Sequence, residues 1–292
     1  MARIFCVGLA TVDLVYRVDR IPGVDEKAQA LSVEVAAGGP ATNAAITAAA
    51  LGAEVTLVSA VGGHPLGNLI RDDLRKHDVR LIDAAAGNAA PPPVSAITVL
   101  DRTGERTIVS RNAGDVAVGV PPEWDPADAD AVLVDGHHPA LAVAAARAAR
   151  TLVVDAGSWR PVFAEILPHA QVVACSAAFR PPAPGDPTEV LRSAGVPHVA
   201  ITRGPEPVRW RSGDRSGEIA VPPVAAVDTA GAGDVFHGAL TVAVAHDPGV
   251  EDFPGALRYA IRIAGLRVAH AGPRGWLAGL TGSGGGPSSG RT

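Results

Sequence analysis

Short apolar runs without polar alternation recur along the chain. They lie at residues 4–7, 55–61, 131–134, 151–154, 171–174 and 198–202. Such runs are typical of strands buried on both faces, and therefore of a parallel sheet. Alanine-rich stretches typical of helices lie at residues 43–51, 66–77, 139–150, 235–246 and 256–269. The alternation predicts an α/β fold with a doubly wound, mostly parallel sheet flanked by helices.

Two segments, at about residues 12–35 and 95–112, instead alternate polar with apolar residues. Alternation is typical of strands with one exposed face, and residues 101–105 (Asp-Arg-Thr-Gly-Glu) suit a turn between two such strands. We expect these segments to form a small β-sheet lid on a single domain that covers residues 1–280. Residues 281–292 are rich in Gly and Ser and have no apolar anchor, so we expect a flexible tail.

The composition excludes several classes of protein. Of the 292 residues, 47% are hydrophobic and 19% are charged, which is typical of a globular chain. The formal net charge of -5 and the absence of a dense Lys/Arg cluster argue against a nucleic-acid partner. No apolar run is long enough to span a bilayer, and the N-terminus is typical of a first strand. We expect a cytoplasmic protein in which Cys6 and Cys175 are buried, reduced thiols.

The strongest chemical signal is the run Asp228-Thr-Ala-Gly-Ala-Gly-Asp234, which leads directly into an apolar helix. Backbone N–H groups of a glycine-rich turn at a helix N-terminus attract anions, and the helix dipole adds to this. A carboxylate beside a bound phosphate is repelled unless it has a task, and in phosphoryl transfer that task is to accept the proton of the attacking hydroxyl. Asp234 is therefore a candidate catalytic base. The alternative is that Asp234 only caps the helix.

A second glycine turn, Gly38-Gly-Pro-Ala-Thr-Asn43, also leads into a helix. Gly38 and Gly39 allow a ligand to approach the backbone, and the Asn43 amide offers both a donor and an acceptor to a polyol. These properties suit a sugar. The alternative is that Gly-Gly-Pro forms only a turn.

Together with Asp13 after the first strand, the two motifs resemble those of the ribokinase family of sugar kinases, the phosphofructokinase-B type. The resemblance covers nearly the whole chain. It implies that Asp13, Gly39 and Asn43 bind the sugar, that Asp234 is the base, and that an anion hole forms over residues 230–233, which are Ala230, Gly231, Ala232 and Gly233.

The resemblance also implies cofactors. ATP and Mg²⁺ are expected, with Asp228, Thr229 and Ala230 on the ATP side, and a K⁺ requirement stays open. Thr202 and Gly204, in Ile201-Thr-Arg-Gly, are similar to the family's turn beside the ATP phosphates and adenine. In the family a carboxylate that helps to place Mg²⁺ often follows the mid-chain strand, but Phe179 stands there, so we name no Mg²⁺ ligand.

Within the family the chain is most similar to the sulfofructose kinase and ketohexokinase branch. Sulfofructose kinases bind the sulfonate with a Lys, an Asn and an Arg, and Lys27, Ser110 and His137 stand at the positions we judge equivalent. Because only the lysine is kept, the resemblance implies a ketose or related sugar, and an anionic group near Lys27 and His137 stays an open alternative.

Two rival functions stay open. One is a nucleoside kinase of the same superfamily. The other is a sugar-binding regulator that has kept the fold without turnover, an alternative raised by Phe179 in place of the carboxylate. Family members commonly dimerise through the lid, so the resemblance also implies a homodimer.

Overall fold

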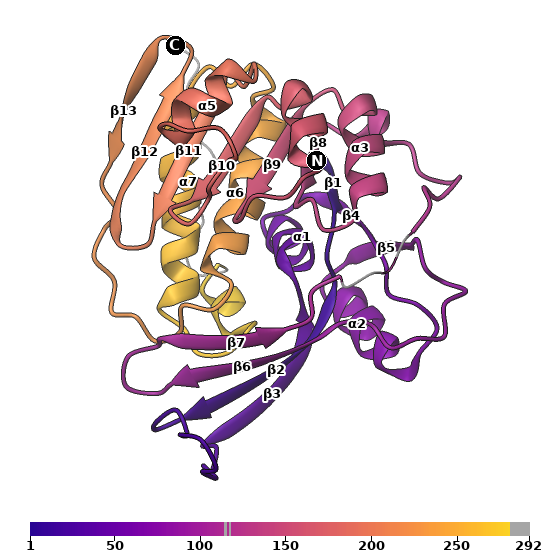
Figure 1. The fold of residues 1–292 in the computed structure, drawn as a ribbon, viewed down its shortest axis with the longest axis vertical. Coiled ribbons are helices and arrows are strands. Elements are labelled where there is room, and N and C mark those ends of the chain that lie inside the picture. Colours follow the sequence, from indigo (N-terminus) through magenta and orange to yellow (C-terminus); the bar gives the residue numbers. More distant parts are fainter. Residues whose placement is uncertain (114–115, 117, 281–292) are drawn as a thin grey trace.

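A nine-stranded sheet forms the centre of the computed structural model, which describes residues 1–113, 116 and 118–280. The expected tail, residues 281–292, lies outside the described residues. The strand order is β13-β12-β11-β10-β9-β8-β1-β4-β5 (Figure 1). Seven strands pair in parallel: β1 (Arg3–Val7), β4 (Glu54–Ser59), β5 (Val79–Asp83), β8 (Ala131–Val134), β9 (Leu152–Ala156), β10 (Val172–Ser176) and β11 (His198–Arg203). Two antiparallel strands, β12 (Glu206–Ser212) and β13 (Arg215–Ile219), extend one edge.

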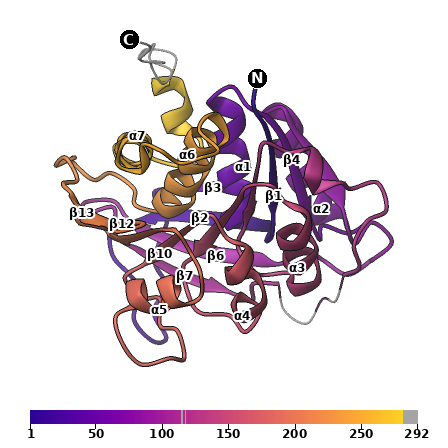
Figure 2. The same ribbon diagram turned by 90° about the horizontal axis from the view of Figure 1, so that it is seen from above.

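Helices cover both faces of this large sheet (Figure 2). The longer ones are α1 (Pro40–Ala50), α2 (Pro65–Lys76), α3 (Pro139–Ala148), α6 (Ala232–His246) and α7 (Phe253–Val268); α4 (Phe163–Ile166), α5 (Pro187–Ser193) and three 3-10 turns, η1 (Pro126–Asp128), η2 (Leu167–His169) and η3 (Gly275–Gly279), are short. Successive residues of β1 contribute to two hydrophobic cores. Cys6 belongs to the core that includes residues of α1, α6 and α7, and Val7 belongs to the core that includes residues of α3, α4 and α5. The fold is thus the doubly wound α/β fold that the sequence predicts.

The two alternating segments form a second, four-stranded sheet, which we call the small sheet. Its strands are β2 (Thr11–Val18), β3 (Ser32–Gly38), β6 (Val94–Leu100) and β7 (Arg106–Ser110), in the order β3-β2-β6-β7. The predicted turn at residues 101–105 joins β6 to β7. Figure 1 shows the small sheet below the large one, beneath the ends of α6 and α7. One face of the small sheet therefore turns toward the rest of the protein, and the other turns away from it.

Other features agree with the composition. Cys6 and Cys175 are both free and buried, and burial raises the pKa of each thiol well above its ordinary range. Among the described residues, the helices are all too short or too polar to cross a bilayer.

Candidate active site

The glycine-rich run forms a tight turn that ends at the first residue of α6. Gly231 adopts a left-handed conformation with φ of 72°, which a glycine reaches without steric cost, and α6 begins at Ala232. The first N–H groups of a helix have no partner within it, and the dipole places positive potential there. Asp234 lies in this first turn, so its carboxylate and an anion-binding helix end are adjacent.

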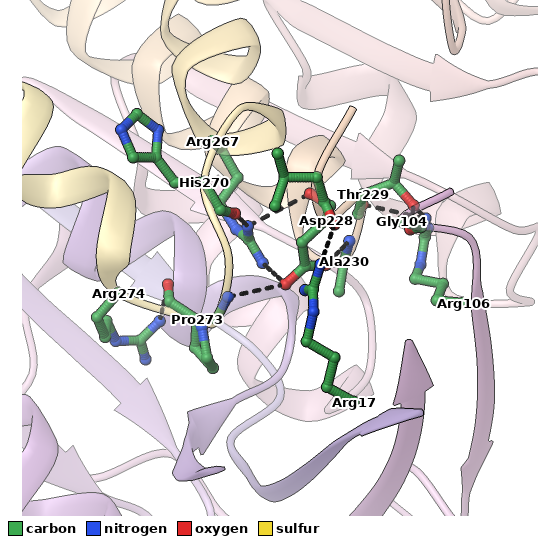
Figure 3. A network of polar contacts seen from close by, with 12 residues as sticks. Arg17, Gly104, Arg106, Asp228, Thr229, Ala230, Arg267, His270, Pro273 and Arg274 are labelled. Carbon is green, nitrogen blue, oxygen red and sulfur yellow. Dashed lines mark hydrogen bonds and ion pairs between the residues drawn. The ribbon is translucent and has the colours of Figure 1, made fainter. Parts of the chain in front are cut away.

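Asp228 holds the start of this turn in place. Its carboxylate is buried, accepts a hydrogen bond from Ala230 N at 2.9 Å, and pairs with Arg267 at 3.1 Å (Figure 3). Gly272 N donates to the same carboxylate at 3.2 Å. Because protein donors surround Asp228, its visible role is to shape the turn.

The small sheet contacts the same turn from the other side. Thr229 donates to Gly104 O through its backbone N at 3.2 Å and through its hydroxyl at 2.9 Å. Arg106, on β7, donates to the Thr229 carbonyl and hydroxyl, both at 3.0 Å (Figure 3). Arg17, on β2, donates to Val227 O at 3.2 Å. The hairpin turn of the small sheet and the turn before α6 are thereby joined.

The second glycine turn brings α1 close to β2. A Cβ on Gly38 would lie 1.9 Å from the Asp13 carboxylate, and one on Gly39, whose φ is 93°, would lie 2.4 Å from Leu9 O. Both positions therefore need glycine. Asp13 accepts from the Thr11 hydroxyl at 2.5 Å. Burial raises the pKa of Asp13, and the nearby Asp234 charge adds to the rise, while hydrogen bonds from hydroxyl groups oppose it.

Asn43 connects the two motifs. It lies on α1, and its Nδ2 donates to Asp234 Oδ2 at 2.8 Å. Its Oδ1 accepts from Arg274 Nη1 at 3.2 Å. Two turns that are far apart in the sequence thus share one direct side-chain contact at the candidate base.

A cavity of about 240 Å³ lies among these residues. Its walls come from the small sheet, α1, the turn before α6, and the segment after α7. Eight residues predicted from the sequence line it: Asp13, Gly39, Asn43, Ser110, Asp228, Ala230, Gly231 and Asp234. Ser110 accepts from the Ser95 hydroxyl at 3.0 Å, and both side chains line the cavity. The predicted sugar and phosphate motifs therefore meet in one place.

Gly38, Ala232, Gly233 and Thr229 lie next to these residues but are not part of the cavity lining. Gly38 supports Asp13, Thr229 binds the small sheet, and Ala232 and Gly233 form the first turn of α6. The structure thus groups them with the site.

Two residues expected near an anionic substrate group lie outside the cavity lining. Lys27 is exposed in the loop between β2 and β3. The His137 side chain is only 6% exposed; its Nδ1 lies 3.1 Å from Asp135, and its Nε2 lies 2.5 Å from Arg160 Nη2. The buried Asp135 also accepts from the backbone N of Leu9 and His137. Although burial alone would raise it, the charge and hydrogen bonds of His137 hold the Asp135 pKa well below its ordinary value.

Thr202 and Gly204 lie at the end of β11, away from this cavity. Thr202 donates to Cys175 O at 3.3 Å, and Gly204 has φ of 62° in the turn before β12. A second cavity, of about 550 Å³, opens at the ends of β10 and β11 and is lined by Ser176, Phe179, Arg180, Ile201, Arg203 and Arg209, among others. Neither Thr202 nor Gly204 lines it.

Phe179, which occupies the position of the family's carboxylate, is fully buried. Its ring packs against Trp159 and Phe163, with centroid distances of 5.8 and 6.1 Å. Over the described residues, no group of three or more His, Cys, Asp or Glu side chains is arranged to hold a metal ion.

A buried pair lies beneath the first turn of α6 and was not expected from the sequence. His237 Nδ1 lies 2.7 Å from Gly233 O and 3.4 Å from Asp155 Oδ2, and Asp155 lies one residue before the end of β9. Burial raises the pKa of Asp155 to about 6, although the His237 charge opposes the rise.

The sequence analysis also missed three arginines of the site, Arg106, Arg267 and Arg274. No local motif marks them, and their partners are distant in the sequence.

Comparison with known proteins identifies the family. The family model described as pfkB family carbohydrate kinase matches residues 1–277. The chain is 29% identical to a ribokinase of Bacillus subtilis strain 168 over 95% of this chain and 96% of the relative. It is 30% identical to an ATP-dependent ribose-1-phosphate kinase of Halopiger xanaduensis over 94% of each chain. Neither of these relatives is named for a ketohexose, so the ketose assignment stays a prediction.

The fold agrees with this family. A solved structure from Agrobacterium tumefaciens, designated provisionally as a ribokinase, superposes with a TM-score of 0.81 at 28% identity and covers 96% of each chain. The match extends over both sheets because it covers nearly the whole chain. The chain belongs to the pfkB family of carbohydrate kinases, which are ATP-dependent phosphotransferases that act on an alcohol group of a sugar.

Proposed function

We propose that this protein transfers the γ-phosphoryl group of ATP to a hydroxyl of a ribose-like or ketose monosaccharide, with Asp234 as the catalytic base. One observation carries the proposal. The Asp234 carboxylate lies at the N-terminus of α6 and lines the same cavity as Asp13, Gly39 and Asn43. An acceptor hydroxyl in this cavity can reach both a proton acceptor and an anion-binding helix end.

The arrangement assigns a task to each side chain. Asp13, held by the Thr11 hydroxyl, accepts hydrogen bonds from sugar hydroxyls. The acceptor oxygen forms a bond to the γ-phosphorus as the bond from that phosphorus to the bridging β-oxygen breaks. The hydroxyl proton passes to Asp234, and ADP leaves. The backbone N–H groups around Gly231 and Gly233 stabilise negative charge on the transferred phosphoryl group.

Mg²⁺ fits this reaction as an ion carried by ATP. It binds carboxylates and phosphate oxygens and usually keeps several waters, and when bound it neutralises charge on the phosphates. The buried carboxylate of Asp155, near the end of β9, is a candidate Mg²⁺ ligand, but it pairs with His237. We therefore assign the phosphates and waters, rather than a protein cluster, as the main ligands.

The volume of the cavity favours a small acceptor. At about 240 Å³ it is smaller than the roughly 300–1,000 Å³ typical of sites for drug-sized ligands. A monosaccharide suits this volume better than a nucleoside does. The rival nucleoside kinase function is therefore less favoured.

One cationic side chain of the cavity, Arg106, suits an acceptor that carries an anionic group. Arg106 lines the cavity, and within the described part of the chain its guanidinium has only the Thr229 oxygens as hydrogen-bond partners, with no carboxylate. By contrast, Arg267 and Arg274 pair with Asp228 and Asp73. Arg106 is therefore better placed than Lys27 or His137 to bind an anionic group of the acceptor. The relative named for ribose-1-phosphate supports a phosphorylated pentose as one candidate.

A panel of acceptors tests the proposal. ADP release is measured with ribose, ribose-1-phosphate, fructose, a sulfonated ketose and a nucleoside, each with Mg²⁺ and with or without K⁺. We expect the highest kcat/KM with a monosaccharide, and a higher kcat/KM for the anionic acceptor that falls in Arg106→Gln. A nucleoside as the best acceptor would overturn the sugar assignment. Sugar binding without turnover of any acceptor would favour the regulator.

We also infer that the protein is a homodimer built through the outer face of the small sheet. Val33, Val35 and Val109 are 53%, 52% and 71% exposed. These three side chains share one face of the small sheet. Leu14 pairs with Val35 on one side and with Ala96 on the other, and Ala96 pairs in turn with Val109. Val33 lies two residues from Val35 on the same strand and therefore on the same face. An exposed apolar face of this kind is typical of an interaction surface.

A further inference from the structure

Four elements meet at the candidate base through one chain of polar contacts. Asp73 on α2 pairs with Arg274 Nη2 at 3.1 Å. Arg274, in the segment after α7, donates through Nη1 to Asn43 Oδ1 at 3.2 Å. Asn43 on α1 donates through Nδ2 to Asp234 Oδ2 at 2.8 Å. Figure 3 shows the Arg274 side chain beside Pro273.

The chain of contacts fixes which way the Asn43 amide faces. A carboxylate only accepts hydrogen bonds, and a guanidinium only donates them. With Oδ1 on Arg274 and Nδ2 on Asp234, both contacts are satisfied. A flipped amide would set its oxygen against the Asp234 carboxylate and its NH₂ against the guanidinium. Arg274 therefore selects the orientation in which Asn43 supports the base.

Arg274 is itself held firmly. Its Nη2 donates to Ala37 O at 2.6 Å as well as to Asp73, and Asp73 also accepts from Ala37 N at 2.9 Å. Its side chain is 19% exposed. Burial lowers the pKa of Arg274, and the Asp73 charge opposes this. A guanidinium with partners on two sides has little freedom to leave Asn43.

We propose that Arg274 is a positioning residue for phosphoryl transfer, which acts through Asn43 to hold the Asp234 carboxylate in its reactive orientation. The proposal rests on the proposed role of Asp234 as the base. Arg274 also lines the cavity, but its guanidinium donates to Asn43, Asp73 and the carbonyls of Ala37 and Pro273, so we assign it to positioning rather than to sugar binding.

A double-mutant cycle tests this proposal. Arg274→Met, Asn43→Ala and the double variant are assayed with the best acceptor, with Arg258→Met as the matched control, since Arg258 is 60% exposed on α7. We expect Arg274→Met alone to lower kcat by about tenfold to hundredfold, the usual effect of a lost hydrogen bond to a charged group. In the Asn43→Ala background the same change should lower kcat less than about threefold, because its route to Asp234 is already absent.

Arg274→Lys gives a second measurement if Arg274→Met fails to fold, as judged by circular dichroism. Lysine keeps the charge opposite Asp73 but has no fork to reach Asn43 as well, so we expect an intermediate loss of kcat. An increase in KM with unchanged kcat would overturn positioning in favour of sugar binding, and additive losses in the cycle would overturn the route through Asn43. Asp234→Asn, measured alongside, separates the two proposals: if it keeps kcat, the base assignment fails, whatever the cycle gives.

Discussion

At the scale of single residues, the buried Asp155–His237 pair links the first turn of α6 to the centre of the large sheet. Nδ1 of His237 lies near both Gly233 O and the Asp155 carboxylate, and its Nε2 lies 3.1 Å from Ala174 O on β10. One imidazole thus contacts a helix and two strands. Because Gly233 precedes Asp234, the position of this ring affects the candidate base.

The pair also makes stability depend on pH. Burial raises the folded-state pKa of Asp155 to about 6, compared with about 3.9 in an unfolded chain. The folded protein therefore binds this proton more tightly than the unfolded chain does. The contribution of Asp155 to the free energy of unfolding is fully present below about pH 4 and is lost as pH rises through about 6. An asparagine at this position mimics the protonated acid. The free energy of unfolding of Asp155→Asn, relative to that of wild type, should therefore rise by roughly 2 kcal/mol between pH 4.5 and pH 7.5.

Urea denaturation at the two pH values measures this change. Asp214→Asn is the matched control, because Asp214 is exposed in the turn between β12 and β13. A gap between wild type and Asp155→Asn that stays constant with pH would contradict the raised pKa.

Residues of the candidate site differ in how far the sequence could reveal them. The runs 38–43 and 228–234 are local, and each leads into a helix, so both could be recognised directly. Arg274 and Asn43 are 231 positions apart, and Arg106 and Thr229 are 123 apart. Pairs of this kind form only when the chain folds, and a lone arginine carries no sequence signal of its partner. The contact between His137 and the buried Asp135 carboxylate likewise could not be identified from sequence position alone.

At the scale of elements, the hairpin turn of the small sheet is coupled to the turn before α6. Gly104 has φ of 67°, and a Cβ there would lie 2.8 Å from the Val227 carbonyl and 3.0 Å from Asp228 N. Gly104→Ala should push the hairpin away and weaken the bonds from Thr229 and Arg106. Loss of one or two hydrogen bonds of about 0.5–1.5 kcal/mol each predicts a decrease in kcat/KM of about tenfold.

Gly213→Ala is the control for Gly104→Ala. Gly213 has φ of 56° in the turn between β12 and β13, and a Cβ there would have no neighbour within 4 Å. Both variants carry the cost of a left-handed alanine, but only Gly104→Ala has the clash. Equal kcat/KM for the two variants would show that the coupling has no effect on catalysis.

Among the elements, those buried on both faces were the easiest to predict. The six predicted strands all exist, and their observed ends lie within about two residues of those expected. The strands β5, β12 and β13 were missed. Their sequences, such as Glu206-Pro-Val-Arg-Trp-Arg-Ser212, mix charged and apolar residues, because these strands lie at or next to an edge of the sheet, are partly exposed and lack the continuous apolar signal.

At the scale of the whole molecule, the outer face of the small sheet predicts a dimer. Val109→Lys and Val35→Lys place charges on that face and should yield a monomer, because an unpaired charge in an apolar interface is costly. Val120→Lys, at a site 48% exposed and outside the small sheet, should leave the mass unchanged. Light scattering at the assay concentration measures this. A wild-type mass equal to one chain would contradict the dimer.

During phosphoryl transfer, Asp234 is expected to take the proton of the sugar hydroxyl. The most direct test measures kcat and the sugar dissociation constant of Asp234→Asn with the best acceptor, with Asp214→Asn as the control. We expect kcat to fall by about 10²–10⁴-fold, the usual contribution of a general base, while the dissociation constant changes less than about threefold. A kcat within about tenfold of wild type would contradict the assignment of Asp234 as the base.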